Sequence, residues 1–325
     1  MTDTTDQAGA AAKPASLLTV LVALAANALI AVAKSVAALI TGSASMVAEA
    51  AHSWADTGNE VFLLVAERTS QRPSDKLHPY GYGRAAYVWS MFAAFGLFVA
   101  GAGVSVWHGI TSLGAVETED TNYTIAYVVL AIAFVLEGTS FRQAVRQTRT
   151  DAAKMGLRPL RFIDRTSNPT LRAVFVEDAS ALIGLVLAGA GLGLHQLTGD
   201  PVWDAVGSIA VGLLLGVMAV FLIRRNRDFL VGQPVLPAVR ENMLRALYDN
   251  PEIDKVTFVH PEFVGPARVL LIAAVDLTGN RPEDEVAAVV NRIEQELTAV
   301  QFVDRAVLTL STPGVPALPR PGASG

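Results

Sequence analysis

The chain has 325 residues, of which 52% are hydrophobic and only 17% are charged, and its mean hydropathy is +0.41. A soluble globular domain carries roughly a quarter charged residues, so this composition excludes a wholly soluble protein and favours a membrane part joined to a soluble part. The absence of cysteine excludes disulfide bonds and thiolate metal sites. The net charge of −5 indicates no partner class, and we expect no nucleic-acid partner.

The first residues do not resemble a targeting segment. Residues 1–15 are small and polar, and we expect them to be disordered. They carry Asp where a signal peptide has Lys or Arg, and the apolar run that follows is too long for a signal peptide. We therefore expect no cleaved signal.

Six segments are long enough to cross roughly 30 Å of hydrocarbon, which takes about 20 residues. They cover residues 16–41, 44–66, 86–113, 122–141, 171–197 and 201–223. The second is the least hydrophobic, because it carries four ionisable side chains. The sequence therefore predicts an α-helical membrane domain of six transmembrane helices over residues 16–225.

The basic residues between these segments fall on one side of the predicted membrane. They are Arg68, Arg72, Lys76 and Arg84 between the second and third spans, Arg142, Arg146, Arg149, Lys154, Arg158, Arg161 and Arg165 between the fourth and fifth, and Arg224, Arg225 and Arg227 after the sixth. The opposite loops hold no Lys or Arg, and one carries Glu117, Glu119 and Asp120. This asymmetry predicts cytoplasmic termini, with the Arg-rich connection on anionic lipid.

The last hundred residues have a different pattern. Residues 236–249 and 281–300 have helical periodicity, and 256–264, 267–277 and 306–311 are typical of strands. This order predicts a cytoplasmic α+β domain of the ferredoxin-like αββαβ type over residues 230–312, with its helices on one face of a sheet. We expect the Pro-rich residues 313–325 to be a disordered tail.

A polar stripe runs along the second predicted span. It consists of Ser45, Glu49, His52, Asp56, Asn59 and Glu60, which follow one another mostly at intervals of three or four residues. Such spacing places them on one face of a helix. An ionisable residue inside a membrane costs roughly 2.5–3.5 kcal/mol on insertion scales and is usually functional. His52 and Asp56, one turn apart, are the first two candidate ligands of a metal ion, and Glu49 and Asn59 are weaker candidates.

The fifth span supplies further candidate ligands. Glu177 and Asp178 are adjacent and otherwise surrounded by apolar residues, and two such carboxylates repel one another unless they are protonated or share a cation. Together with His52 and Asp56 they predict a nitrogen and oxygen site for Zn²⁺, or for Mn²⁺, Fe²⁺ or Co²⁺. Because these ligands lose protons when they bind a metal, they can also carry protons, which predicts exchange of metal for protons.

Other polar residues of the spans have structural explanations of equal weight. Glu137 can pair with Arg142 or cap a helix, so it is left outside the predicted site. Lys34 and Asn27 in the first span are either structural partners of other polar residues or residues that line the pore. His108 and His195 lie near helix ends, and His260 is interpreted as an ordinary strand histidine.

Residues 41–60 (TGSASMVAEAAHSWADTGNE) and 78–90 (HPYGYGRAAYVWS) resemble the cation diffusion facilitator family, and most closely its zinc transporters related to the mammalian ninth zinc transporter. The resemblance covers about residues 16–312. It implies proton-coupled export of a divalent metal by a homodimer with alternating access. No enzymatic activity and no cofactor are expected, since the metal is the transported ion and protons are the counter-ion.

The resemblance also implies two ligands from the second helix and two from the fifth, each pair four residues apart. His52 and Asp56 match the first pair, and Asp178 matches one member of the second. The other member falls on Val174, which cannot bind a metal, and Glu177 is its natural substitute. A carboxylate in place of an imidazole makes the site harder, so the preference for zinc over Mn²⁺, Fe²⁺ or Co²⁺ stays open.

A second family site is expected to be weak or absent. Asp75 and His78 match two of its ligand positions, whereas Tyr82 stands where some members have another His. The alternative interpretation is a structured turn. In the C-terminal domain, Thr257, Leu310 and Thr312 occupy positions where some relatives place ligands, so we expect dimer contact rather than metal sensing there.

The rival functions are an intramembrane metalloenzyme, a membrane scaffold and a transporter of organic cations or of protons alone. An intramembrane metalloenzyme lacks a His-Glu-x-x-His pattern, and a membrane scaffold leaves the polar stripe unexplained. A transporter of organic cations or of protons alone could use the same acidic stripe. The location expected from the loops and the absence of a targeting peptide is the plasma membrane of a prokaryote.

Overall fold

The computed structural model describes residues 17–114, 123–300 and 302–321. Its described residues separate into two compact units, one within residues 17–71 and 85–227 and the other within residues 72–84 and 228–321. The expected disorder of residues 1–15 and the acidic Glu117, Glu119 and Asp120 lie outside the described residues.

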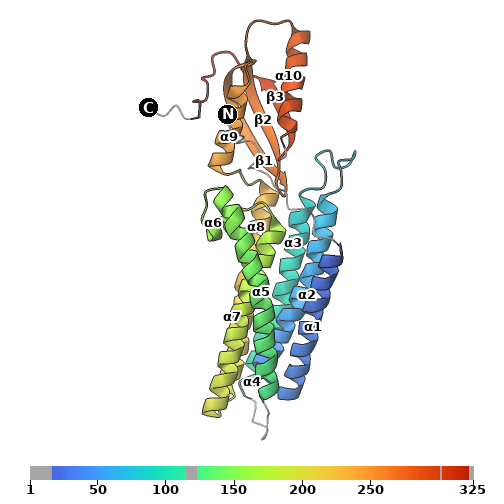
Figure 1. The fold of residues 1–325 in the computed structure, drawn as a ribbon, viewed down its shortest axis with the longest axis vertical. Coiled ribbons are helices and arrows are strands. Elements are labelled where there is room, and N and C mark those ends of the chain that lie inside the picture. Colours follow the sequence, from blue (N-terminus) through green and yellow to red (C-terminus); the bar gives the residue numbers. More distant parts are fainter. Residues whose placement is uncertain (1–16, 115–122, 301, 322–325) are drawn as a thin grey trace. The chain divides into compact units, whose positions relative to one another are not determined.

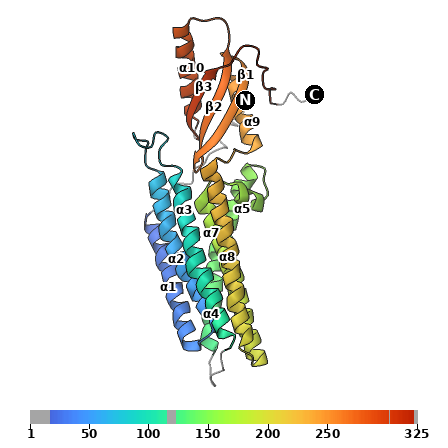
Figure 2. The same cartoon turned by 180° about the vertical axis from the view of Figure 1, so that it is seen from behind.

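The first unit is a bundle of long helices (Figures 1 and 2). Its elements are α1 (Leu17–Thr41), α2 (Ala44–Ser70), α3 (Ala85–Gly96), the π-helix η1 (Leu97–Gly103), α4 (Val104–Ser112), α5 (Thr124–Lys154), α6 (Pro159–Arg165), α7 (Pro169–Thr198) and α8 (Val202–Val231). α2 is packed against α1, α3 and α7, and α5 against α1 and α7. The polar stripe of α2 therefore has neighbouring helices to face.

Five helical segments of the described chain are long and apolar enough to cross a membrane: Leu24–Thr41, Ala85–Ser112, Thr124–Lys154, Pro169–Thr198 and Val202–Val231. α2 is also long enough, at 27 residues, which is about 40 Å of helix. It is less apolar than those five segments because it carries the charged residues of the polar stripe. The predicted class, a helical membrane domain followed by a small α+β domain, is confirmed.

Several helices differ in extent from the hydropathy pattern. α5 continues to Lys154 and α8 to Val231, beyond the predicted ends at 141 and 223. Hydropathy marks only the apolar part of a helix, and the Arg-rich residues that follow are themselves good helix formers. The arginines at 142–149 are therefore helical rather than part of a loop. η1 interrupts the third span, and π-helical turns within α-helices are often found at functional sites.

Local sequence signals explain where the helices begin and end. The side chain of Ser43 accepts a hydrogen bond from the amide of Met46 and caps α2. Asn168 does the same for α7, followed by Pro169, and Gly199 ends α7 with a left-handed φ of 71°. Buried Arg172 donates to the carbonyls of Ile163 and Thr166, which fastens α6 beside the start of α7.

Small residues allow close helix packing in the half of the bundle that contains the α1–α2 turn. A Cβ atom on Gly207 would lie 2.5 Å from Oγ of Ser45, and one on Gly191 would lie 3.0 Å from the carbonyl oxygen of Trp203. Small residues at such crossings are typical of membrane helices. This part of the bundle is therefore tightly closed.

The second unit holds α9 (Pro237–Asp249), β1 (Ile253–Gly265), β2 (Arg268–Leu277), α10 (Glu283–Thr298) and β3 (Val303–Leu310). β2 is the central strand, antiparallel to β1 and parallel to β3. Along β2 every second residue is buried, and these residues share one core with α9 and α10. Both helices therefore cover the same face, as predicted for αββαβ order.

The end of the chain is not a free tail as far as it is described. Residues 322–325 lie outside the described residues, but Leu318 packs against the core and its amide donates to Val256 at 2.7 Å. The hydroxyl of Tyr248 donates to the carbonyl of Leu318 at 2.5 Å. The expectation of disorder is therefore wrong for this part, because an apolar residue among the prolines finds a place on the core.

Candidate metal centre

The polar stripe of α2 is buried. Glu49 and His52 are fully buried, Ser45 and Asn59 nearly so, and the side chain of Asp56 is 17% exposed. Because α2 packs on α1, α3 and α7, these groups face helices rather than lipid. A buried polar group costs free energy unless it is paired, so each partner is informative.

The ends of the stripe have structural partners. At the start of α2, Oγ of Ser43 and the amides of Ala44 and Ser45 donate to the buried carboxylate of Asp204 at 2.9, 2.5 and 3.1 Å. At the other end, Nδ2 of Asn27 donates to Oε1 of Glu60 at 2.6 Å. Ser45 and Glu60 are thus engaged in holding helices together.

Lys34 is a buried cation within this unit. Its ammonium group is fully buried and lies 2.9 Å from Oε2 of Glu49 and 3.1 Å from Oε1 of Glu137. These three residues come from α1, α2 and α5. Glu49, predicted as a weaker metal ligand, is therefore the ion-pair partner of a lysine here. Glu137, excluded on sequence grounds, pairs with Lys34 in the structure.

His52 and Asp56 form the centre of the stripe. Nε2 of His52 lies 3.3 Å from Oδ2 of Asp56. Neither ring nitrogen of His52 has a hydrogen-bond partner, and Oδ1 of Asp56 also lacks one. Buried polar atoms are rarely left unpaired. An imidazole and a carboxylate with free acceptor atoms are the donor set that Zn²⁺ prefers.

The two carboxylates of α7 point to different partners. Glu177 is buried and accepts a hydrogen bond from Nδ2 of Asn59, which joins α7 to α2. Asp178 accepts one from Oγ of Ser140 on α5 at 2.8 Å. Val174 is partly buried and packs in an apolar cluster. Within the described residues, no group of three or more His, Asp or Glu side chains is placed to hold a metal ion.

The structure thus pairs His52 with Asp56, places Asn59 against Glu177, and directs Asp178 to Ser140. The predicted four-ligand set is not assembled in this conformation, and its membership stays a prediction. Most of the buried polar side-chain atoms without a hydrogen-bond partner in the described residues lie on this stripe and beside it: Glu49, His52, Asp56, Asn59, Glu60 and Glu137 each contribute one or more.

The loop after α2 is a structured turn. Oδ1 of Asp75 accepts from the amides of Leu77 and His78 at 2.9 and 2.7 Å, and Oδ2 accepts from the Tyr82 hydroxyl at 2.7 Å. The Tyr82 hydrogen bond, with those amides, holds the pKa of Asp75 below its usual value, and the same bond raises the pKa of Tyr82. Nδ1 of His78 lies 3.4 Å from Asp75. A metal on Asp75 and His78 has to compete with these bonds.

The same loop packs on the C-terminal domain. Arg84 pairs with Glu262 at 2.6 Å. A Cβ atom on Gly83 would lie 2.5 Å from the carbonyl oxygen of Val264, so only glycine permits this approach. The glycines of the HPYGYG segment are thus required for packing.

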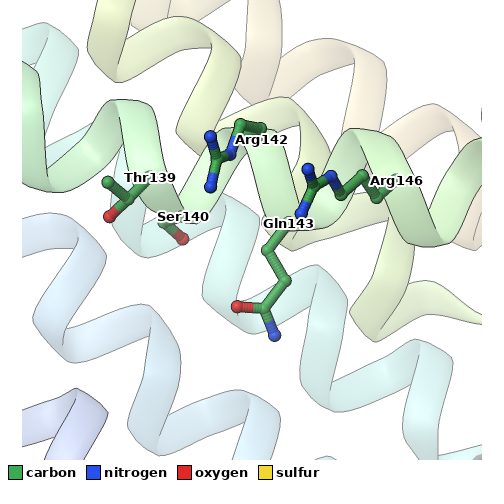
Figure 3. A pocket seen from close by; sticks show the side chains of 5 residues that line it. All are labelled: Thr139, Ser140, Arg142, Gln143 and Arg146. Atoms are coloured by element: carbon green, nitrogen blue, oxygen red, sulfur yellow. The ribbon is translucent and has the colours of Figure 1, made fainter.

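A cavity of about 520 Å³ lies along α5, lined by Thr139, Ser140, Arg142, Gln143 and Arg146 (Figure 3). Two guanidinium groups make it unfavourable for a divalent cation. It is therefore not the metal site, although its Ser140 contacts Asp178.

The other histidines are away from the stripe. His195 is buried at the end of α7 and contacts the ring of Tyr123, His108 lies in the middle of α4, and His260 is an exposed residue of β1. Thr257 donates to the carbonyl of Ala274 within the sheet.

Sequence reasoning missed Asp204 and left the role of Lys34 open. Asp204 lies three residues after Gly199-Asp200-Pro201, where an acidic residue is ordinary for the first turn of a helix such as α8. A lone lysine in an otherwise apolar first span was the available signal for an internal ion pair, but its partners lie 15 and 103 residues away.

Comparison with known proteins identifies the family. The family model "Cation efflux transmembrane domain" matches residues 20–231. The chain is 34% identical over 287 residues to the proton-coupled zinc antiporter SLC30A9, mitochondrial, of Xenopus laevis, covering 86% of this chain and 51% of that protein. It is 36% identical over 234 residues to metal tolerance protein C4 of Arabidopsis thaliana, which covers 72% of this chain and 51% of that protein. It is 33% identical over 261 residues to human SLC30A9, which covers 80% of this chain and 46% of that protein.

The chain thus spans about half the length of these curated relatives. The expected plasma membrane location is wrong, because the SLC30A9 relatives are designated mitochondrial and point to a mitochondrial membrane. Loop charge reports only which side of a membrane is basic, and it does not identify the membrane. From the family match and from these identities, the chain belongs to the cation efflux family and is a multi-pass membrane protein similar to SLC30A9.

Proposed function

We propose that this chain moves Zn²⁺ across a membrane in exchange for protons, at a site centred on His52 and Asp56. Both SLC30A9 relatives carry the name proton-coupled zinc antiporter. The observation that carries the proposal is the set of unpaired ring nitrogens and carboxylate oxygen of these two residues inside a membrane helix. A metal ion is a partner that can bind both an imidazole nitrogen and a carboxylate oxygen through their lone pairs.

The remaining ligands are proposed to come from α7. Asn59 donates to Glu177, and Asn59 lies three residues after Asp56 on the same helix face. Asp178 is held by Ser140. We propose that Asp178 and Glu177 turn toward His52 and Asp56 when the ion binds, each leaving one hydrogen bond. The cost of that exchange is offset by coordination.

Proton exchange follows from the same residues. Carboxylates and the imidazole bind a metal only in their deprotonated form, so entry of the ion releases protons and departure of the ion allows them to return. The site opens alternately to the two sides of the membrane, once with the metal bound and once with protons bound. This alternation couples the movement of the metal to the movement of protons. No resident cofactor is proposed, because the metal is the transported ion and protons are the counter-ion.

Mn²⁺, Fe²⁺ and Co²⁺ remain alternative cargo. Val174 packs among apolar side chains, so the α7 contribution is proposed to be oxygen from Glu177 and Asp178. Oxygen ligands favour harder ions than imidazole does. We also propose a homodimer, with residues 230–312 as the dimer contact.

The test is uptake of metal into proteoliposomes that hold the full chain, with Zn²⁺ and Mn²⁺ measured separately, with and without a pH gradient. The proposal expects Zn²⁺ uptake that a pH gradient accelerates and that Asp56→Asn reduces at least a hundredfold. Equal rates of Zn²⁺ uptake with and without the pH gradient contradict proton coupling. Equal rates for Asp56→Asn and the parent chain contradict the site.

A further inference from the structure

The cluster of Lys34, Glu49 and Glu137 lies beside the proposed site but is not used by it. Lys34 and Glu49 are completely buried, and the side chain of Glu137 is 13% exposed. A buried charge is expensive even when paired, and an ionisable residue within a membrane span is usually functional. A mere connection between α1, α2 and α5 could be made by uncharged hydrogen bonds at lower cost.

The cluster is on one defined side of the proposed site. α2 begins at the Ser43–Asp204 contact and ends near the basic residues Arg68 and Arg72. Glu49 precedes His52 by three residues, about 4.5 Å along the helix, and Asp56 follows it by four. An ion at His52 that came from the basic side would therefore meet the cluster next on its way across.

His52 is bounded by this cluster as well as by Asp56. A Cβ atom on Gly184 of α7 would lie 2.6 Å from Oε1 of Glu49 and 3.6 Å from Nδ1 of His52. These two atoms thus flank the same glycine. Neither has a hydrogen-bond partner. Lys34, which holds the other oxygen of Glu49, is consequently close enough to act on an ion at His52.

The charges do not cancel. One ammonium group contacts two carboxylates, so the ionised cluster has a net charge of −1, and the unpaired oxygens of Glu49 and Glu137 add no counter-charge. Without Lys34 the net charge would be −2 beside the proposed site. Electrostatic interactions are strong over such distances in a poorly polarisable interior, so the lysine weakens the attraction for a divalent cation.

We propose that Lys34 is a tethered cation that limits the affinity of the His52 and Asp56 site, so that a bound metal ion can leave toward the far side. Lys34 is a positioning and affinity-setting residue and does not contact the ion. Transport requires binding that is favourable enough for entry and weak enough for release. This inference rests on the proposed metal site.

The experiment measures zinc affinity, by calorimetric titration of the purified full chain, in variants that change the net charge of the Lys34, Glu49 and Glu137 cluster. Binding that Asp56→Asn removes is assigned to the site. Lys34→Met gives the cluster a net charge of −2 and is expected to bind Zn²⁺ at least fivefold more tightly and to transport more slowly. Glu137→Gln gives zero and is expected to bind at least fivefold more weakly.

Two further variants separate charge from structure. Lys34→Arg and the double variant Lys34→Met with Glu137→Gln both keep −1, and both are expected to bind within twofold of the parent chain. If Lys34→Met does not fold, the double variant is compared with Glu137→Gln, because removal of the lysine then changes the cluster charge from 0 to −1. The double variant is expected to bind Zn²⁺ at least fivefold more tightly than Glu137→Gln, and equal or weaker binding would overturn the role of Lys34. A purely structural lysine predicts weaker or unchanged binding in every folded variant that lacks it.

The outcomes distinguish failure of the proposed metal site from failure of the proposed role of Lys34. If the parent chain shows no zinc binding that depends on Asp56, the proposed function fails. If that binding is present but folded Lys34→Met leaves it unchanged or weaker, the role of Lys34 is overturned and the site stands. Affinities that follow the cluster charge support both.

Discussion

Nε2 of His52 lies 3.3 Å from Oδ2 of Asp56 one helical turn away in the middle of α2, where His52 is buried and the side chain of Asp56 is 17% exposed. The other polar residues of that helix face have partners: Ser45 has Asp204, Glu49 has Lys34, Asn59 has Glu177 and Glu60 has Asn27. His52 and Asp56 have only each other. The proposed site is therefore the part of the stripe that the fold does not use for its own support.

Gly184→Ala tests whether the space beside His52 is needed. The added Cβ atom would lie 2.6 Å from Oε1 of Glu49, closer than real contacts, so we expect the carboxylate to move and zinc transport to fall at least fivefold. Zinc flux in proteoliposomes measures this. The control is Gly189→Ala on the same helix, where a Cβ atom meets nothing within 4 Å. Equal flux in both variants would show that the space has no role.

Asp204→Asn tests the fastening of α2 to α8. The buried carboxylate accepts three hydrogen bonds at the start of α2, where a negative charge also favours the helix dipole. The amide cannot accept all three, so we expect a loss of about 1–3 kcal/mol, seen as a lower melting temperature in detergent. Asp254→Asn, at an exposed strand position, is the control and should change little. An unshifted melting temperature for Asp204→Asn argues against this role.

The loop of Asp75 should be sensitive to acid. The lowered pKa of Asp75 means that its ionised form stabilises the loop at pH values above its unfolded pKa, about 3.9. That contribution is lost as the pH falls through the lower folded value. We expect the amides of Leu77 and His78 to be protected from hydrogen exchange at pH 6 and to lose protection below about pH 4.

The control for this loop is Asp75→Asn, which should show the weaker protection at both pH values, after correction for intrinsic exchange rates. Protection at pH 3 equal to that at pH 6 in the parent chain would mean that the carboxylate does not hold the turn. Zinc flux should be unchanged in His78→Ala, since we place no transported ion there.

Glu177→Gln separates the two carboxylates of α7. Gln keeps the size of Glu and still accepts from Asn59, but it supplies no charge to a metal. We expect at least tenfold weaker zinc binding, or a changed ratio of Zn²⁺ to Mn²⁺ binding, in calorimetric titrations. Ser140→Ala, which removes only the hydrogen bond to Asp178, should have a smaller effect. A Glu177→Gln profile that matches the parent chain would make Glu177 a structural residue.

The sequence allowed the helical membrane domain, the αββαβ order and the buried stripe to be predicted, because each depends on local periodicity and hydropathy. It did not reveal which stripe residues are free. That depends on partners far along the chain, such as Lys34 for Glu49 and Asp204 for Ser43, and helix packing brings them together. Hydropathy does not predict the helical extensions of α5 and α8, because their last turns are polar. Proline content does not predict the placement of Leu318, because that depends on its packing against the core.

The most direct test of the account is zinc binding by the purified full chain and by His52→Ala and Asp56→Asn, measured in one calorimetric series with His260→Ala as control. His260 is an exposed histidine of β1, so the control removes an imidazole without touching the stripe. The account predicts one zinc site that His52→Ala and Asp56→Asn each weaken at least a hundredfold, and that His260→Ala leaves unchanged. Full-affinity zinc binding in folded Asp56→Asn would contradict it.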